Sequence, residues 1–512
     1  MRAMLARCFS AAIAGLDASV VEVEVNTGQG IPQVVIVGLP DKAVNESRDR
    51  VKTALENSGF SHVRTRTTIN LAPADVKKEG PIYDLPMALG ILAATGQCAF
   101  PRLGEFLVVG ELALNGAVRP ARGVLSMALL AKAKRRAGVL APMDNVAEAG
   151  VVEGIEVYGV SSLRECAEFL SGKIHLEPRR SDAEALFAKS SRYDLDFSDV
   201  KGQTHAKRAM EVAVAGGHNL LMIGPPGSGK SMLAKRLPSV LPPMTLEEAL
   251  ETTRIHSVAG LLAAGQAIVA ARPFRAPHHT ISDVALTGGT ADLRPGEVSL
   301  AHHGVLFLDE LPEFKRATLE AMRQPIEDGT VNVARATGSV QFPCRFMLVA
   351  SMNPCPCGFL GDPKKECRCS PSQVQKYRAK ISGPLLDRVD LHVEVPAVSY
   401  GEIMTPAAAE PSAAVRERVM AAREFQYQRF RRRGRINAHM SPKGTRIHCA
   451  LDAEGAAFLK AAMDEMGFSA RAHDRILRVA RTIADLDRSE RLAPNHLGEA
   501  LQYRALDRAA WS

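Results

Sequence analysis

The 512-residue chain has no long apolar run. No stretch approaches the roughly 18 consecutive apolar residues that a membrane-spanning helix needs. Near the N-terminus, Arg7 and Asp17 interrupt the apolar residues and leave no continuous core of a signal peptide. We therefore expect a cytoplasmic protein without a membrane partner.

Cysteine is scarce and unevenly placed. The chain has nine cysteines, an odd number, and four of them lie close together. This pattern argues against a disulfide framework and for reduced thiols or a metal site.

The charge composition excludes few classes of protein. The formal net charge is +8 with a pI near 9.0, while 46% hydrophobic and 23% charged residues are ordinary for a soluble globular protein. The positive balance permits a polyanionic partner, but a mildly basic enzyme fits equally well. The length predicts about two to four domains.

The first motif with a chemical meaning is GPPGSGKS. It lies between an apolar run, Asn219 to Ile223, and a helical pattern that begins at Met232. A strand, a glycine-rich turn and a helix in this order are the setting of a phosphate-binding loop, whose backbone N–H groups and helix N-terminus bind phosphate oxygens. We predict that Lys230 binds the β- and γ-phosphates of ATP and that Ser231 ligates Mg²⁺; the alternative is an ordinary βα turn. The predicted ATP-binding residues are Gly224, Pro225, Pro226, Gly227, Ser228, Gly229, Lys230 and Ser231.

An acidic pair follows a second apolar run. Val305 to Leu308 is unbroken and apolar, as in a strand buried on both faces of a parallel sheet, and Asp309 and Glu310 come next. We predict that Asp309 holds Mg²⁺ beside Ser231 and that Glu310 polarises the attacking water.

Two further residues are candidates for the same site. Asn353 follows a third apolar run and is a candidate to bind the γ-phosphate or the water. Arg388 lies in a loop before another strand pattern and suits an arginine finger that reaches into the site of the next subunit. Isolated arginines are usually surface ion-pair partners, so only the neighbouring motifs single out Arg388.

The first 170 residues mix strand and helix patterns and predict an α/β or α+β unit. This unit resembles the Lon-protease-like domain in the segments KKEGP (77–81) and GELALNG (110–116). On that pattern, Ile82 and Leu125 stand at the positions of the protease family's serine and lysine. Because neither can act as a nucleophile or base, we expect no peptidase activity but a role in oligomerisation or DNA contact.

Over nearly its whole length, the chain resembles the magnesium-chelatase-like AAA+ ATPases of the ComM/YifB type. The resemblance is carried by the N-terminal unit, GPPGSGKS, VLFLDE, ASMNPCPCG, ISGPLLDRVDLHVEV and the segment from Ser469 to Leu486. It implies that this last segment belongs to a helical lid whose second-sensor arginine is Arg471, with Arg475 as the alternative. It also implies a hexameric ring around DNA that drives branch migration during recombination, whereas composition and spacing indicate only a P-loop ATPase.

The predicted fold class is α/β: a P-loop AAA+ core with a helical C-terminal lid, preceded by the α+β Lon-like domain. The predicted ranges are 1–170 for the Lon-like domain, 171–195 for a polar linker, 196–400 for the core with a cysteine-rich insert at 355–369, and 401–512 for the lid.

The insert contains two C-x-C pairs separated by nine residues. Four thiolates in two close pairs can form a tetrahedral zinc site, although C-x-C is tighter than the usual C-x-x-C. The alternative is a loop with four free thiols. The candidate ligands are Cys355, Cys357, Cys367 and Cys369.

Two histidine pairs and one basic stretch allow more than one interpretation. His278–His279 and His302–His303 have no fixed metal geometry; we expect loop contacts to DNA or a neighbouring subunit, and surface histidines are an equal alternative. The range 416–435 contains eight arginines and two glutamates with interleaved aromatic residues. Such a stretch can bind phosphates and stack bases, but a solvated lid helix is slightly favoured.

We predict an ATP-driven motor on single-stranded or branched DNA that promotes branch migration during natural transformation. ATP and Mg²⁺ are its expected cofactors, zinc is a candidate, and a homohexamer is the expected assembly. The alternatives are a chelatase motor subunit, an ATP-dependent remodelling factor without helicase activity, an ATP-dependent protease and a non-enzymatic DNA clamp. The N-terminal unit and the cysteine insert argue against the chelatase, Ile82 and Leu125 against the protease, and the intact motor motifs against the clamp.

Overall fold

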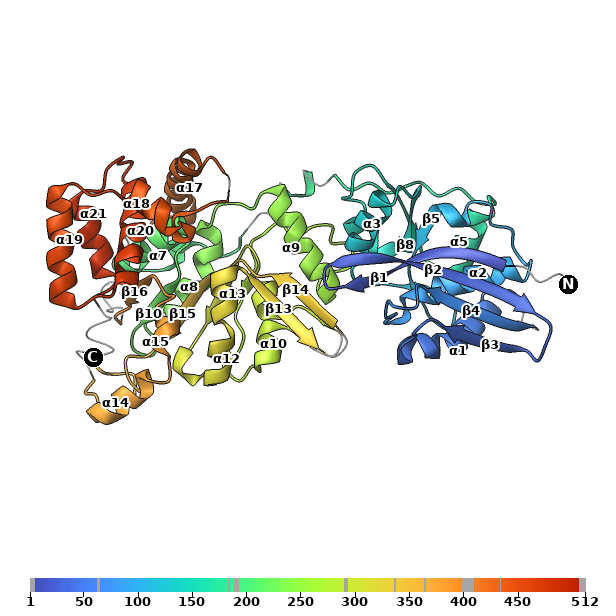
Figure 1. Ribbon diagram of the computed structural model, residues 1–512, viewed down its shortest axis with the longest axis horizontal. Helices are drawn as coiled ribbons and strands as arrows, with labels where there is room; N and C mark the ends of the chain where they lie inside the picture. The colour runs from blue at the N-terminus through green and yellow to red at the C-terminus, as the bar shows by residue number, and fades with distance from the viewer. Residues whose placement is uncertain are drawn as a thin grey trace. The chain divides into compact units, whose positions relative to one another are not determined.

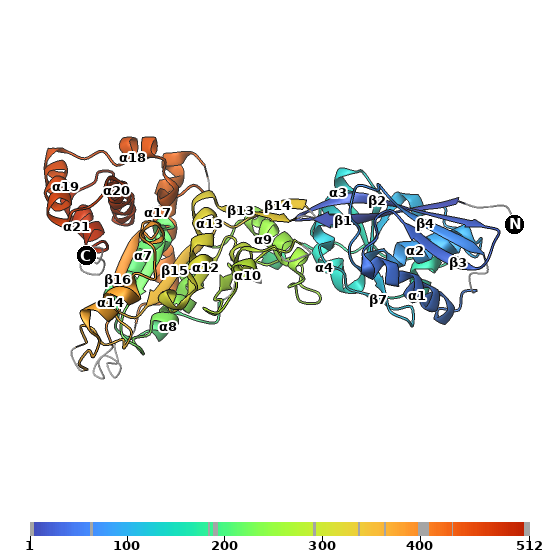
Figure 2. The ribbon, with the colours of Figure 1, turned by 60° about the horizontal axis from the view of Figure 1, so that its bottom comes forward.

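The computed structural model describes most of the chain as two compact units. Unit 1 contains residues 1–191 together with 245–270 and 293–295, and unit 2 contains residues 192–244, 271–292 and 296–512. Figure 1 and Figure 2 show both units. The described residues are 5–61, 65–182, 185–187, 193–289, 293–335, 338–362, 365–397, 409–432 and 434–505.

Unit 1 is built on a seven-stranded mixed sheet. Strand β2 pairs antiparallel with β1 and β4, whereas the other neighbouring pairs are parallel. In sheet order the strands are β3 (Gln33–Val37), β4 (Arg66–Ala72), β2 (Asp17–Gly28), β1 (Leu5–Ala14), β5 (Phe106–Val108), β8 (Gly138–Pro142) and β9 (Glu156–Val160). A small hairpin of β6 (Glu111–Leu112) and β7 (Val118–Arg119) lies apart from it.

Helices complete unit 1. They are α1 (Lys42–Asn57), α2 (Asp84–Ala94), α3 (Val124–Ala133), α4 (Val146–Ala149), α5 (Leu163–Leu170) and α9 (Leu246–Ala259). Helix α2 is buried along almost its whole length and packs on β1 and β2, as its unbroken apolar sequence predicts. The mixture of strand and helix patterns expected in the first 170 residues is confirmed by these strands and helices.

Strand β1 was not predicted from the sequence, because its residues were considered only as part of a possible signal peptide. Its residues pair with β2 over their full length around a two-residue turn at Gly15 and Leu16. Gly15 has a φ of 64°, a conformation that tight hairpin turns favour at glycine.

The ranges predicted for the linker and the core differ from the two units. Part of the linker pairs with unit 1, since the N–H of Arg179 donates to Val157 and that of Ser181 to Gly150. Residues 245–270, within the predicted core range, also belong to unit 1. There Ser257 of α9 contacts the buried carboxylate of Glu148, and α9 packs on α3. The linker residues 188–192 and the predicted core–lid boundary at 400 and 401 lie outside the described residues.

Unit 2 contains a five-stranded sheet in which every pair is parallel. The order is β11 (Phe274–Arg275), β12 (Val305–Leu308), β15 (Met347–Met352), β10 (Leu220–Ile223) and β16 (Leu391–Glu394). The apolar runs predicted before the phosphate loop, before Asp309 and before Asn353 are the central strands β10, β12 and β15. The α/β class with a parallel sheet is therefore confirmed. A hairpin of β13 (Thr330–Arg335) and β14 (Gly338–Pro343) interrupts the chain between β12 and β15.

Helices accompany the parallel sheet of unit 2. They are α7 (Thr204–Gly216), α8 (Lys230–Val240), α10 (Asp283–Thr287), α11 (Glu297–Leu300), α12 (Arg316–Ala321), α13 (Arg323–Asp328), α14 (Pro371–Arg378) and α15 (Gly383–Leu386). A C-terminal group follows, coloured orange to red in Figure 1: α17 (Ser412–Phe430), α18 (Pro442–His448), α19 (Ala453–Met466), α20 (Ala470–Leu486) and α21 (Pro494–Gln502). Helices α17 and α20 pack on α7 and share its hydrophobic core.

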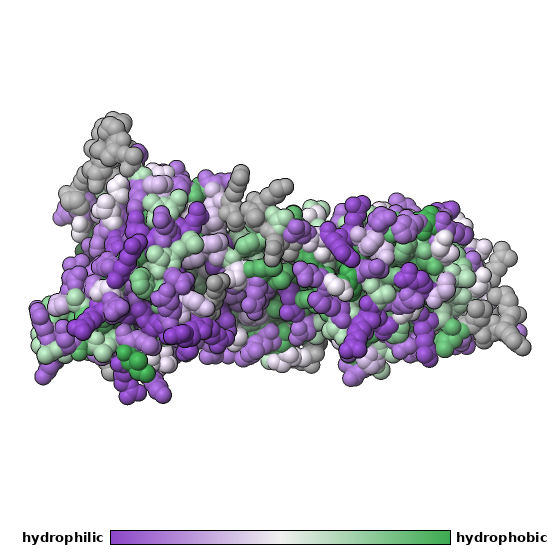
Figure 3. Space-filling view, turned by 90° about the horizontal axis from the view of Figure 1, so that it is seen from above, coloured by the Kyte–Doolittle hydropathy of each residue, from purple (hydrophilic) through white to green (hydrophobic). Residues whose placement is uncertain are grey.

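The surface is mainly hydrophilic on the face that Figure 3 shows, with hydrophobic residues in small groups. Within the described ranges, no helix is both long enough and apolar enough to span a bilayer.

Candidate functional site

The phosphate loop lies at the carboxyl end of the parallel sheet. Strand β10 is fully buried, and the loop connects it directly to α8, as predicted. Gly227 and Gly229 have φ values of 78° and 92°, which favour glycine. A Cβ at Gly224 would lie 2.1 Å from the carbonyl oxygen of Val395, because the loop leaves the sheet in close contact with the end of β16. The loop geometry therefore depends on these glycines.

Lys230 points back into the loop. Its Nζ donates to the carbonyl oxygens of Gly224 at 2.7 Å and Pro225 at 2.9 Å, and it lies 3.4 Å from Oδ1 of Asn353. Burial lowers the pKa of Lys230 below its ordinary value, although the carboxylates of Asp309 and Glu310 oppose this effect. The ammonium group therefore occupies the centre of the loop, where it can meet phosphate oxygens.

The residues predicted to bind Mg²⁺ are brought together. Ser231 Oγ donates to Oδ2 of Asp309 at 2.6 Å, across the gap between α8 and the end of β12. The other carboxylate oxygen accepts from the hydroxyl of Ser351 and from the N–H of Glu310. Hydroxyl and carboxylate oxygens are the ligands that Mg²⁺ prefers, so this donor set fits the ion.

Sequence reasoning missed Ser351. It lies on β15, where it pairs with Met222, while its neighbour Ala350 pairs with Leu308. A polar residue near the end of an otherwise apolar central strand was the available signal. Because β15 lies between β12 and β10, such a residue has to lie close to Asp309.

Glu310 projects from a left-handed turn beside a histidine. Its φ is 54° and its side chain is 55% exposed, so the carboxylate can reach solvent. The Nδ1 atom of His279 lies 3.4 Å from Oε2 of Glu310, and the ring of His278 lies against that of His279 with centroids 4.1 Å apart. The first histidine pair therefore borders the catalytic candidate, a contact that the sequence did not predict.

The second histidine pair is not a surface feature. His302 is fully buried, and its Nδ1 accepts from the N–H of Arg345 at 2.9 Å. The surface alternative is thus wrong for His302, which connects the start of β12 to the segment before β15.

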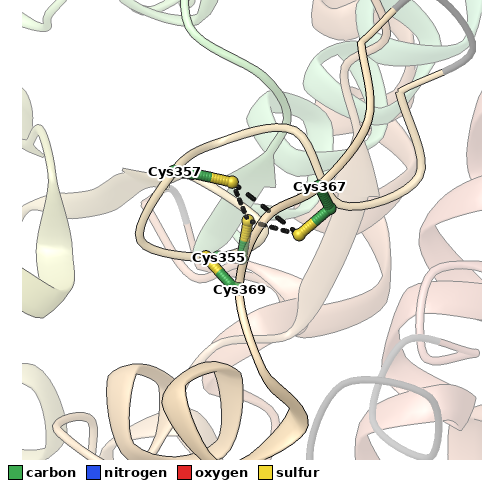
Figure 4. A group of neighbouring side chains, drawn as sticks. All are labelled: Cys355, Cys357, Cys367 and Cys369. Atoms are coloured by element: carbon green, nitrogen blue, oxygen red, sulfur yellow. Dashed lines mark hydrogen bonds between the residues drawn. The ribbon is translucent and has the colours of Figure 1, made fainter.

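Asn353 follows β15 and faces Lys230, and the cysteine insert begins two residues later. The sulfur of Cys355 lies 3.4 Å from that of Cys357 and 3.7 Å from that of Cys367, and Cys357 and Cys367 are 3.7 Å apart. The four Sγ atoms all lie within 4.8 Å of one another (Figure 4). A tetrahedral site with Zn–S bonds of about 2.3 Å has sulfur–sulfur edges of about 3.8 Å, so the donor set fits zinc. Hydrogen bonds from the backbone of Phe359 and Arg368 lower the pKa of Cys357 to about 6.

Arg388 lies at the opposite edge of the sheet from its own phosphate loop. Its carbonyl oxygen accepts from Nδ2 of Asn219, the residue before β10. The phosphate loop follows the other end of β10, and a strand of this length spans about 13 Å. The guanidinium group of Arg388 pairs with Glu327 and donates to the carbonyl oxygen of Pro384 at 2.5 Å.

The two second-sensor candidates lie at that same amino edge. The side chain of Arg471 is 77% exposed and reaches Oδ2 of Asp387 at 3.9 Å, next to Arg388 in the chain. The guanidinium of Arg475 is mostly buried and lies 3.8 Å from Oδ1 of Asp390. Arg471 is therefore the residue of the two that is free to contact another molecule.

Four of the eight arginines of the basic stretch form side-chain hydrogen bonds or ion pairs inside unit 2. Arg416 and Arg423 donate to backbone carbonyls, Arg418 pairs with Glu211 and Glu410, and Arg429 pairs with Asp485. These contacts support the interpretation as a lid helix rather than a DNA-binding one. Arg433 lies outside the described residues.

The two Lon-like segments of unit 1 lie side by side. The N–H of Gly110 donates to Ile82, and the N–H of Leu85 donates to Gly110. Leu125 is buried and Ile82 is partly buried, both in apolar surroundings. The Lon-like resemblance and the expected lack of peptidase activity both stay predictions.

Three family models match successive parts of the chain. The model described as "Subunit ChlI of Mg-chelatase" matches residues 23–145, "Magnesium chelatase, subunit ChlI" matches 196–403, and "Magnesium chelatase, subunit ChlI C-terminal" matches 409–504. Because the first of these falls in unit 1, the N-terminal unit no longer argues against a chelatase, contrary to our expectation.

Individual relatives are similar over very different lengths. Competence protein ComM of Haemophilus influenzae is 45% identical over 510 residues, 98% of each chain. The uncharacterized protein YifB of Escherichia coli is 45% identical over 498 residues, 96% of each chain. The chloroplastic magnesium-chelatase subunit ChlI of rice is only 23% identical, over 44% of this chain and 54% of its own. The chain therefore belongs to the magnesium-chelatase-like family of the ComM and YifB type.

Proposed function

We propose that the protein is an ATP-hydrolysing motor whose sites form between copies of the chain. The observation that carries this proposal is the convergence of Lys230, Ser231, Asp309 and Asn353 at one edge of the sheet, with Arg388 at the other. Lys230 would bind the β- and γ-phosphates, and Ser231 and Asp309 would hold Mg²⁺. These groups supply binding and orientation within one subunit.

Hydrolysis requires a polarised water and a cation near the γ-phosphate. Glu310 is exposed beside the loop and would take the water's proton, while Asn353 would orient the water or the γ-phosphate. Arg388 cannot serve its own site from the opposite edge, so we assign it to the site of a neighbour. Arg471 lies beside Asp387 at the same edge and would act together with Arg388.

A site built from two opposite edges of the sheet requires head-to-tail contacts between subunits. One edge offers a phosphate loop and the other offers arginines, so each interface is heterologous and a closed ring satisfies every site. We propose a homo-oligomeric ring, most simply the hexamer that the family resemblance implies, acting in the cytoplasm.

We propose that the motor acts on single-stranded and branched DNA and promotes branch migration during natural transformation. Support comes from the competence protein that shares nearly the whole length of this chain and from the net charge of +8. The test is strand exchange on a synthetic four-way junction, with Lys230→Ala as the inactive control. ATPase activity without junction movement would remove the branch-migration claim and leave an ATP-dependent remodelling factor.

A chelatase motor subunit is the second candidate. The family descriptions favour it, but the chloroplast chelatase subunit matches less than half of this chain. Stimulation of ATPase activity by forked DNA and none by a porphyrin with Mg²⁺ would decide for the DNA motor; the reverse result would decide for the chelatase.

We propose that the cysteine insert binds one zinc ion through Cys355, Cys357, Cys367 and Cys369. The sulfur–sulfur distances match a tetrahedral site, and the four thiolates need a cation to offset their charge. Metal analysis of protein purified under reducing conditions should find one zinc per chain. Protein free of zinc would contradict the assignment.

A further inference from the structure

The cysteine loop touches the phosphate loop at one point. Gly358 follows Cys357, and a Cβ at Gly358 would lie 2.5 Å from Cδ and 2.7 Å from Cγ of Pro226. The backbone of the cysteine loop therefore rests directly on the proline ring in the middle of GPPGSGKS. Gly358 also has a φ of 84°, so both the approach and the conformation require glycine.

The thiol cluster determines where Gly358 lies. The N–H of Gly358 donates to the carbonyl oxygen of Cys355 at 3.0 Å, which closes a tight turn around Cys357. The sulfur atoms of Cys355 and Cys357 both lie 3.7 Å from that of Cys367. A shift of this turn would therefore move two of the four sulfur atoms, and a change in the cluster would move Gly358.

The start of the cysteine loop is anchored next to the site. Asn353 contacts Lys230 at the start of the loop. The carbonyl oxygen of Pro354 accepts from Nε of Arg378 at 3.3 Å and from Nη2 at 3.2 Å, and Arg378 ends helix α14 beyond the cysteines. Both contacts hold the start of the loop beside the phosphate loop, and Arg378 joins it to helix α14.

We propose that metal bound by the four cysteines holds the Gly358 turn against Pro226 and thereby keeps the phosphate loop in its nucleotide-binding conformation. This rests on the proposed zinc and ATP sites. Without a metal ion, the cluster would lose the four metal–sulfur bonds that hold its sulfur atoms 3.4 to 3.7 Å apart, and the turn would loosen. Nucleotide binding would then include the cost of ordering the phosphate loop, and affinity would fall.

Two glycine substitutions test the contact without touching a cysteine. Gly358→Ala introduces a methyl group into Pro226, whereas Gly361→Ala, with a φ of 79° and nothing within 4 Å, introduces the same backbone strain into open space. We expect Gly358→Ala to weaken binding of a fluorescent ATP analogue about tenfold and Gly361→Ala less than about twofold, in protein of equal zinc content. Equal affinity in the two variants would overturn the proposal.

Zinc removal gives a second, independent measurement. Wild-type protein would be stripped by a chelator, freed of it, and assayed with Mg²⁺ before and after zinc is restored. We expect wild-type affinity to fall and recover, and the affinity of Gly358→Ala to respond less than about twofold, because the contact is already lost. Wild-type affinity that is unchanged by zinc removal would refute the coupling, whereas wild-type protein that binds no nucleotide with zinc present would refute the proposed ATP site.

Discussion

Arg388→Ala is the substitution that most directly tests a site shared between subunits. Its cost to folding stability should be modest: the Arg388 side chain is only 12% exposed but Glu327 is 57% exposed, so loss of this half-buried ion pair costs about 1 to 2 kcal/mol. Loss of the hydrogen bond to Pro384 adds about 1 kcal/mol. An arginine finger, by contrast, is worth about 10³-fold or more in kcat, or about 4 kcal/mol of activation free energy.

The expected result is therefore a separation of binding from hydrolysis. Arg388→Ala should lower ATP turnover by about 10³-fold and leave the affinity for ATP within about threefold, because the arginine acts on the transition state. Glu327→Gln is the matched control: it removes the ion pair but keeps the arginine, and should keep nearly full turnover. If Arg388→Ala weakened ATP binding as much as Lys230→Ala, the assignment to a neighbouring site would be wrong.

Mixed oligomers make the test sharper. Lys230→Ala subunits offer an intact Arg388, and Arg388→Ala subunits offer an intact phosphate loop. With random mixing in equal amounts, about one interface in four combines both intact halves, so about a quarter of wild-type turnover should return if sites act independently. Mass spectrometry must show that mixed oligomers form. Mixed oligomers without any recovered turnover would refute the two-edge site.

Three further predictions concern protonation and positioning. Because burial lowers the pKa of Lys230, its positive charge should be lost at lower pH than that of an exposed lysine. ATP affinity should therefore fall as pH rises through that pKa. Calorimetry in different buffers should detect proton uptake on ATP binding at alkaline pH. His279→Gln removes the imidazole beside Glu310 and should lower kcat about 3- to 10-fold, with KM unchanged and an altered pH–rate profile. An unchanged pH–rate profile would assign His279 a structural role only. Burial raises the pKa of Asp390, but its contact with His218 at 3.5 Å and the nearby Arg475 outweigh burial and lower that pKa. The stabilisation therefore exists above the ordinary carboxylate pKa and is lost as pH falls through the lowered one. Asp390→Asn should cost about 3 kcal/mol near neutral pH in urea unfolding, and a stability difference that persists undiminished in acid would contradict the pairing.

The sequence alone determined the parts of this protein whose chemistry is local. Four apolar residues before GPPGSGKS predict a buried strand, and the glycines predict the turn, because both depend on neighbouring residues only. The same holds for Asp309 at the end of β12 and for the C-x-C pairs. That Lys230, Asp309 and Asn353 meet could also be expected, since parallel strands bring their carboxyl ends to one edge.

Only the tertiary structure decided the contacts between segments without a shared local pattern. Nothing in the sequence near Arg388 says that the strand after it, β16, pairs in parallel with β10 beside the phosphate loop. Nor does it place α9 in unit 1, where a buried Glu148 contacts it, or Gly358 on Pro226. Such contacts join residues far apart in the chain, and their energies depend on burial and packing that form only when the whole fold closes. Local chemistry identified the site, and long-range packing determined which groups complete it.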